Sequence, residues 1–281
     1  GDNRELLDEA LRMASRSDII VAALGECAEM SGESASRTSL EIPDAQQDLL
    51  KALVKTGKPV VLLLFTGRPL VLNWEDANVH SILNVWFGGS ETGDAVADVL
   101  FGKVTPSGKL TTTFPRSVGQ LPLFYNHLNT GRPDPDSHIF NRYASNYLDE
   151  SNEPLYPFGY GLSYTDFVYG ELQISSETLP KNGELTVSVT VTNKGNYDGY
   201  ETVQLYLHDI YAEIARPVKE LKGFERVFLK SGESRDVKFV ITEDDLKFYN
   251  SELHYVYEPG EFDVMVGPNS RDVQTKSFQA K

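Results

Sequence analysis

The feature that most constrains the fold is a change of hydrophobic period near Tyr164. Before it, short apolar runs alternate with segments in which apolar residues recur at helical spacing. After it, apolar residues such as Val187 and Val189 occupy every second position. A period near 3.6 is typical of helices, and a period of two is typical of half-buried strands. We therefore predict two domains of different classes, at residues 1–163 and 164–281.

The first domain is predicted to be an α/β sandwich. Almost uniformly apolar runs predict buried strands at 18–24, 59–65 and 81–87, and the run at 18–24 is expected to be covered on both faces. Helical patterns precede the first run, follow Pro43 and occupy residues 93–101. Strands that alternate with helices favour a mostly parallel sheet.

The second domain is predicted to be all β. Roughly seven short strands with turn signals between them are typical of an antiparallel sandwich of immunoglobulin or fibronectin type III kind. Between the two domains, residues 105–162 are rich in Pro, Gly, Asn and aromatic residues. The long segment 125–152 could reach a neighbouring subunit, which makes a homodimer one hypothesis. The aromatic residues of 156–164 either stack on sugar rings or pack at a domain interface.

Composition excludes several kinds of partner. The formal net charge of −15 argues against nucleic acid, because phosphate binding needs clustered Lys and Arg. A single cysteine, Cys27, excludes an internal disulfide framework, and the scattered histidines have no partners at metal-ligand spacing. No apolar run approaches the roughly 20 residues that span a bilayer. We therefore predict no metal, no cofactor, no nucleic-acid partner and no membrane partner.

The most polar loop follows the first predicted strand, at residues 25–37. It carries Glu26, Glu29, Glu33 and Arg37 among small residues. Ligands of α/β sheets bind beyond the carboxyl ends of the strands, and a glutamate placed there can act as a general acid if its surroundings raise its pKa. The alternative interpretation of this loop is a solvated acidic surface.

Several motifs in order along the chain resemble the C-terminal part of family-3 β-glucosidases, in particular those of bacterial periplasmic type. They are Gly-Glu at 25–26, Ser-Gly-Glu at 31–33, Leu-Glu-Ile-Pro at 40–43, Gly-Arg-Pro at 67–69, Trp-Phe-Gly-Gly-Ser-Glu-Thr-Gly at 86–93, Pro-Ser-Gly-Lys-Leu at 106–110, Tyr-Pro-Phe-Gly-Tyr-Gly-Leu-Ser-Tyr at 156–164 and Leu-Lys-Gly-Phe at 221–224. Each motif is weak alone, and their order and spacing together are specific.

The resemblance implies an enzyme with three parts. An N-terminal β/α barrel, which nothing in this sequence resembles, holds an aspartate nucleophile, and the α/β sandwich and a fibronectin type III-like domain follow it. The family's first strand and helix of the sandwich also have no counterpart here, so the resemblance implies that the sheet is incomplete at its start. Glu33 matches the position of the family's acid/base and is the predicted catalytic residue. Glu29 and Arg37 are the predicted substrate-binding residues, and Glu29 is also the competitor for the acid/base role. Arg37 is expected to orient the loop or to keep Glu33 ionised, and Glu26 is expected to be structural.

The expected function is that of a secreted or periplasmic retaining exo-β-glucosidase, which removes terminal non-reducing β-D-glucosyl residues from β-glucosides or oligosaccharides. This chain is expected to be a fragment that supplies the general acid/base and is inactive without the barrel. One alternative is a β-xylosidase or another exo-glycosidase of the same family. A second is a non-catalytic carbohydrate-binding module, and a third is a dimerisation unit.

Overall fold

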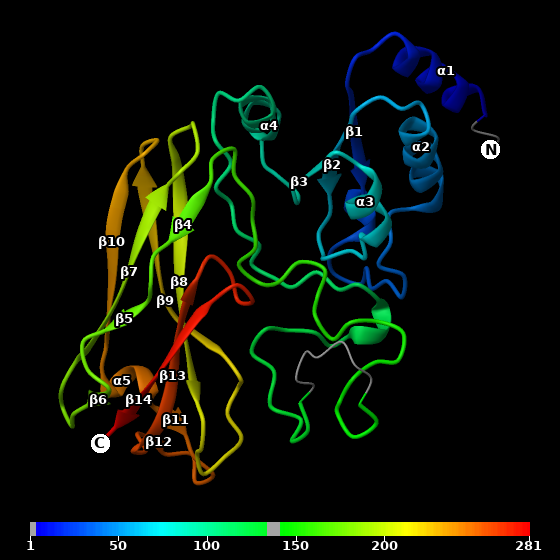
Figure 1. Cartoon of the computed structure of the whole chain (residues 1–281). Helices are drawn as coiled ribbons and strands as arrows, with labels where there is room; N and C mark the ends of the chain where they lie inside the picture. Colours follow the sequence, from blue (N-terminus) through cyan, green and yellow to red (C-terminus); the bar gives the residue numbers. More distant parts are fainter. Residues whose placement is uncertain (1–3, 134–140) are drawn as a thin grey trace. The chain divides into compact units, whose positions relative to one another are not determined.

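A computed structural model describes residues 4–133 and 141–281. The chain divides into two compact units (Figure 1). One unit contains residues 1–100 and 114–121, and the other contains residues 101–113 and 122–281. Residues 101–113 and most of 122–163 therefore pack with the C-terminal strands.

The N-terminal unit is built on a parallel sheet of three strands. These are β1 (Ile20–Gly25), β2 (Val60–Phe65) and β3 (Ser81–Asn84), in the order β1-β2-β3. The helices are α1 (Arg4–Ser15), α2 (Asp44–Val54), α3 (Asn73–Asn78) and α4 (Thr92–Leu100). Two short 3-10 helices cover Ala28–Met30 and Val118–Gln120. The predicted mostly parallel α/β arrangement is confirmed.

The main core of this unit lies on one face of the sheet, where Ile20, Leu62 and Leu64 are buried together with Leu50 and Leu53 of α2. On the opposite face, Leu63 of β2 is also buried. Helix α2 contacts β1, and α1 lies beside α2 (Figure 1). Apolar residues at helical spacing thus give α2 one buried stripe that packs against the alternating inward side chains of the strands.

The opposite face of β1 is not covered, so one expectation is wrong. Val21 is 51% exposed, and Ala23 is also exposed. The run at 18–24 predicted a strand buried on both faces, as in the middle of a parallel sheet. β1 instead lies at the edge of the sheet, and its side chains are buried on one face only within the described residues.

The C-terminal unit is a β-sandwich, as predicted, and its strand pairs are antiparallel except the short parallel pair of β6 with β14. One sheet has the order β10-β7-β4, with β5 also paired to β7, and the other has the order β6-β14-β13-β8-β9. The strands of these two sheets are β4 (Phe167–Tyr169), β5 (Gln173–Ile174), β6 (Thr178–Leu179), β7 (Leu185–Asn193), β8 (Gly199–Asp209), β9 (Glu220–Leu229), β10 (Ser234–Ile241), β13 (Gly260–Gly267) and β14 (Gln274–Ala280). Between β10 and β13 the chain forms the short helix α5 (Glu243–Leu246) and a small hairpin of β11 (Phe248–Tyr249) and β12 (Tyr255–Val256). Alternating residues of β7, β8 and β13 fill the core between the sheets.

Polar side chains of β8 attach the irregular segments to this sandwich. Lys109 forms an ion pair with buried Glu201, with Nζ 3.1 Å from Oε1. The side-chain amide of Gln204 donates to the Gly159 carbonyl at 3.2 Å. A Cβ at Gly159, whose φ is +80°, would lie 2.0 Å from Oε1 of Gln204. These contacts explain why residues 101–113 and the 156–161 region belong to the C-terminal unit.

Candidate functional site

The predicted catalytic loop lies where parallel strands end together. β1 ends at Gly25 and β2 ends at Phe65, and these two residues are paired in register. The loop that follows β1 therefore meets the loop that follows β2 at the carboxyl edge of the sheet, which is the usual position of a site in such folds. The side-chain amide of Gln46 on α2 fixes the start of the loop, because it accepts from the Gly25 N–H at 2.7 Å and donates to the Gly25 carbonyl at 2.9 Å.

Glu33 stands at the outer turn of this loop with an exposed side chain. Both of its neighbours have positive φ, with +143° at Gly32 and +59° at Ser34. A serine in the left-handed region costs on the order of 1 kcal/mol, and such conformations persist where surrounding contacts impose them. The backbone is thus held in an uncommon shape that turns Glu33 outward, where its carboxyl group can meet another surface.

Glu26 is the buried centre of the loop. Its side chain is 0% exposed, with Oε1 lying 2.8 Å from Nη1 of Arg37 and 3.1 Å from Nε of Arg68. Oε2 accepts from the Thr66 hydroxyl at 2.9 Å and from the Gly67 N–H at 3.2 Å. Burial alone raises the pKa of Glu26, but these hydrogen bonds and the charge of Arg68 outweigh it and lower the pKa below the ordinary value. An ionised, fully bonded carboxylate is unsuited to donate a proton.

Arg37 is placed on Glu26, not on Glu33. Its Nη2 also donates to the Glu41 carbonyl at 3.2 Å, so the side chain joins both ends of the loop. Of the two roles expected for Arg37, this geometry favours orienting the loop. Contact of Arg37 with substrate stays a prediction.

Glu29 lies on the 3-10 helix of Ala28–Met30 and is exposed. Its pKa is lowered because its carboxylate accepts a hydrogen bond from its own backbone N–H and another from the Cys27 thiol. A general acid needs a raised pKa, so this arrangement argues against Glu29 for that role. A substrate-binding role for Glu29 stays a prediction.

The sequence analysis missed three contributors to this site. Arg68, Thr66 and Gly67 follow the second predicted strand, and all three bond to Glu26. The Gly-Arg-Pro motif at 67–69 contributed to the family resemblance, but the sequence predicted no role for its residues in the site. The rule that loops after neighbouring parallel strands meet would have placed it beside Glu26.

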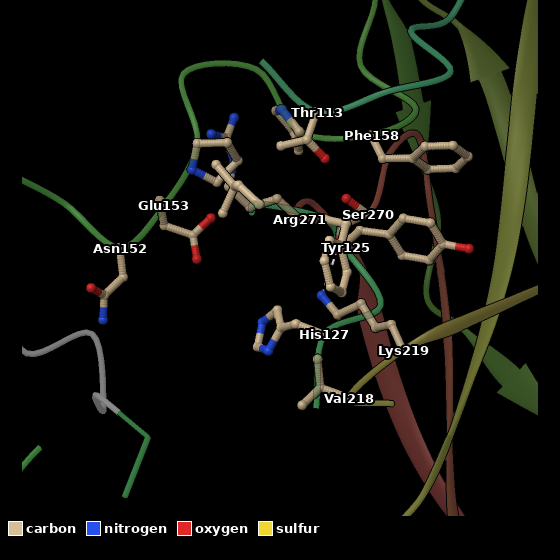
Figure 2. A pocket seen from close by; sticks show the side chains of 14 residues that line it. Thr113, Tyr125, His127, Asn152, Glu153, Phe158, Val218, Lys219, Ser270 and Arg271 are labelled. Atoms are coloured by element: carbon tan, nitrogen blue, oxygen red, sulfur yellow. Dashed lines mark hydrogen bonds between the residues drawn. The ribbon is translucent and has the colours of Figure 1, made fainter. Parts of the chain in front are cut away.

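A concave site also lies within the C-terminal unit. It is a cavity of about 250 Å³. Figure 2 shows Tyr125, Phe158, Glu153, Lys219 and Arg271 among its lining residues. The rings of Tyr125 and Phe158 stack on each other with centroids 4.4 Å apart. Burial lowers the pKa of Lys219, whose ammonium group donates to the Ser270 carbonyl. The cavity is polar, and the Tyr125 and Phe158 rings pack on each other at its edge.

Within residues 4–133 and 141–281, no group of three or more His, Cys, Asp or Glu side chains could hold a metal ion. In the same residues, no helix is long and apolar enough to cross a membrane. Part of the segment 125–152, predicted to reach a neighbouring subunit, lies outside the described residues, and the homodimer stays a prediction.

Comparison with known proteins places this geometry in a family. Residues 2–164 match the family described as "Glycosyl hydrolase family 3 C-terminal domain". Residues 201–270 match the family described as "Fibronectin type III-like domain". A periplasmic β-glucosidase of Salmonella typhimurium is 50% identical over 275 residues, which are 98% of this chain and 36% of that protein. A β-xylosidase of Formosa agariphila is 43% identical over 281 residues, which cover 99% of this chain and 38% of that protein.

Solved structures agree. The β-glucosidase of Listeria innocua, in complex with gluconolactone, superposes with a TM-score of 0.93 at 43% identity, over 99% of this chain and 38% of that chain. The chain therefore spans little more than a third of the length of these relatives. It belongs to glycoside hydrolase family 3, and it comprises the family's C-terminal α/β domain followed by a fibronectin type III-like domain.

Proposed function

We propose that this chain is the acid/base part of a retaining exo-β-glucosidase, with Glu33 as the acid/base. The observation that carries the proposal is the exposed Glu33 on a loop that hydrogen bonds attach to the carboxyl edge of the parallel sheet. Glu26, the other carboxylate at the base of the loop, is buried and fully engaged in hydrogen bonds and ion pairs. Similarity to β-glucosidases of Salmonella typhimurium and Listeria innocua supports the reaction class.

The proposed reaction has two steps. Glu33 in its acid form protonates the departing glycosidic oxygen while an aspartate of the barrel domain attacks the anomeric carbon. The leaving group departs as an alcohol, and a glycosyl-aspartate ester remains. Glu33, now a carboxylate, takes a proton from water, and the water oxygen attacks the same carbon and releases the sugar and the aspartate. Two carboxyl groups about 5–5.5 Å apart are required, and the second one comes from outside this chain.

The first prediction concerns Glu33 in the full-length enzyme. Glu33→Ala should turn over an aryl glucoside with a good leaving group about 10²–10⁴-fold more slowly, because removal of the glycosyl group from aspartate lacks its base. Added azide should restore turnover and give β-glucosyl azide, since azide attacks without base assistance. The measurement is steady-state release of the phenol, with product analysis by NMR.

Glu29→Ala is the matched control, because it removes a second exposed carboxylate from the same loop. At saturating substrate it should keep kcat within a few-fold of the unaltered enzyme and show no azide effect, because its predicted substrate-binding role would change KM. Azide rescue of Glu29→Ala with none for Glu33→Ala would transfer the acid/base role to Glu29.

The sugar specificity has a second candidate. A β-xylosidase of Formosa agariphila is 43% identical to this chain, so a similar C-terminal part occurs in a protein named for a second specificity. Comparing aryl β-glucoside with aryl β-xyloside on the full-length enzyme separates the two, and a higher kcat/KM for the xyloside would replace glucose by xylose in the proposal. A periplasmic location is proposed from the Salmonella relative, and cell fractionation tests it.

A further inference from the structure

Arg68 makes contacts that reach beyond the ion pair with Glu26. It lies in the loop after β2, and its side chain is 19% exposed. Its Nη2 donates to the Ala35 carbonyl at 2.9 Å and also to the Met30 carbonyl. Met30 and Ala35 lie on either side of Glu33 in the sequence. One guanidinium group from another loop therefore holds the backbone before and after the proposed acid/base.

The neighbouring glycine allows this close approach. A Cβ at Gly67 would lie 1.9 Å from the Ser31 hydroxyl oxygen, so only a glycine lets the 30–35 segment pack against the loop after β2. Positive φ at Gly32 and Ser34 then completes the turn that carries Glu33. After the 3-10 helix ends at Met30, one backbone hydrogen bond, from the Ala35 N–H to the Gly32 carbonyl at 3.2 Å, closes the turn around Glu33. The side-chain bonds of Arg68 to the Met30 and Ala35 carbonyls attach this turn to the loop after β2.

The chemistry explains why an arginine is suited to this position. A guanidinium group is planar and has five N–H donors in a fixed arrangement, so it can bind a carboxylate through Nε and carbonyl oxygens through its outer nitrogens at once. The Glu26 carboxylate keeps the guanidinium in place and balances its charge. A lysine would keep the charge beside Glu26 but would not reproduce these directed bonds.

We propose that Arg68 is the positioning residue of the acid/base loop. By bonding the Met30 and Ala35 carbonyls, it sets where the Glu33 carboxyl group stands relative to the glycosidic oxygen. Arg68 touches neither the reacting atoms nor Glu33 in the contacts described above, so it acts through the backbone of the loop. This inference rests on the proposed role of Glu33.

The test uses the dependence of the rate on the leaving group. A misplaced general acid slows the first step for phenols of high pKa, which need protonation as they leave, and hardly affects 2,4-dinitrophenol, which does not. In the full-length enzyme, Arg68→Met should lower kcat/KM about 10²-fold for the phenyl glycoside and less than about threefold for the 2,4-dinitrophenyl glycoside. Arg68→Lys should show the same selectivity, because it restores the charge without the directed bonds.

A role in stability alone would give a different result. It would lower kcat/KM equally for both substrates, in proportion to the folded fraction, and that outcome would overturn the proposal. An unchanged kcat/KM for both substrates in Arg68→Lys would also overturn it. Arg216→Lys is the matched control, since Arg216 forms a partly buried pair with Glu220 in the C-terminal unit, and it should show no leaving-group selectivity. If Arg68→Met does not fold, Arg68→Lys decides alone.

Glu33→Ala in the same assay separates the two proposals. If it lacks the selective loss on the phenyl glycoside, the proposed function fails and the role of Arg68 fails with it. If Glu33→Ala shows the loss and the folded Arg68 variants do not, only the inference about Arg68 is wrong.

Discussion

Asp209, at the end of β8, is a buried carboxyl group whose negative charge is not fully balanced by hydrogen bonds or by a neighbouring cation. It is 7% exposed, and neither of its carboxylate oxygens makes a hydrogen bond of ordinary geometry to a described residue. Burial raises its pKa from 3.8 to about 6, and the opposing charge of Arg216 offsets this only in part. The folded state therefore binds a proton at pH values where the unfolded chain has already released it.

The sign of the resulting pH dependence follows from this raised pKa. The free energy of unfolding should fall as the pH rises from about 4 to about 6, where the folded protein binds more protons than the unfolded chain. Asp209→Asn should remove this component and stabilise the protein at pH 7.5 by on the order of 2 kcal/mol. Urea unfolding at pH 4.5 and 7.5 measures both effects. If the free energy of unfolding changed by the same amount between these pH values in the unaltered protein and in Asp209→Asn, the pH dependence would not come from Asp209.

At the residue scale, the acid/base role of Glu33 could be predicted from the sequence only through its resemblance to a family. Its type, charge and spacing did not distinguish it from Glu29, since both are exposed glutamates of one acidic loop. The structure adds the lowered pKa of Glu29 and the outward turn at Glu33. Arg68 was not predicted, because the contact between residues more than thirty positions apart depends on sheet register.

At the scale of the elements, the end of β1 depends on one glycine. Gly25 has a φ of +136°, and a Cβ there would lie 1.8 Å from the Phe65 carbonyl oxygen. Gly25→Ala should destabilise the protein by more than about 2 kcal/mol, because backbone strain and a clash with β2 add together. Gly57→Ala is the matched control: φ is +73°, but the added methyl group meets open space. Denaturant unfolding compares the stability of the two variants. Equal losses of unfolding free energy would show that backbone strain alone, without the clash with β2, explains the requirement for glycine at position 25.

The strands and long helices were predictable because their periodicity is strong, but α3 was missed. Asn73–Asn78 is too short to show a helical repeat. Yet β2 and β3 are parallel, and parallel neighbours need a crossover connection, so the topology itself required an element there. The exposed face of β1 could not be predicted, since an apolar run does not reveal what covers it.

At the scale of the whole molecule, activity should require the part of the enzyme outside this chain. The 281-residue chain should release no phenol from an aryl glucoside above the uncatalysed rate, because a retaining mechanism needs a nucleophile that this chain is proposed to lack. The full-length enzyme at equal molar concentration is the control. Turnover by the chain alone that disappears in Glu33→Ala would place both carboxyl groups within these residues.

The exposed edge of β1 has a consequence for handling and assembly. An edge strand presents a row of unpaired N–H and C=O groups, and here Val21 adds an apolar side chain to it. Such an edge is a template for another strand, whether from a neighbouring segment of the same enzyme or from a second misassembled copy. A chain whose β1 edge stays open is therefore expected to aggregate more readily than one in which another strand pairs with that edge.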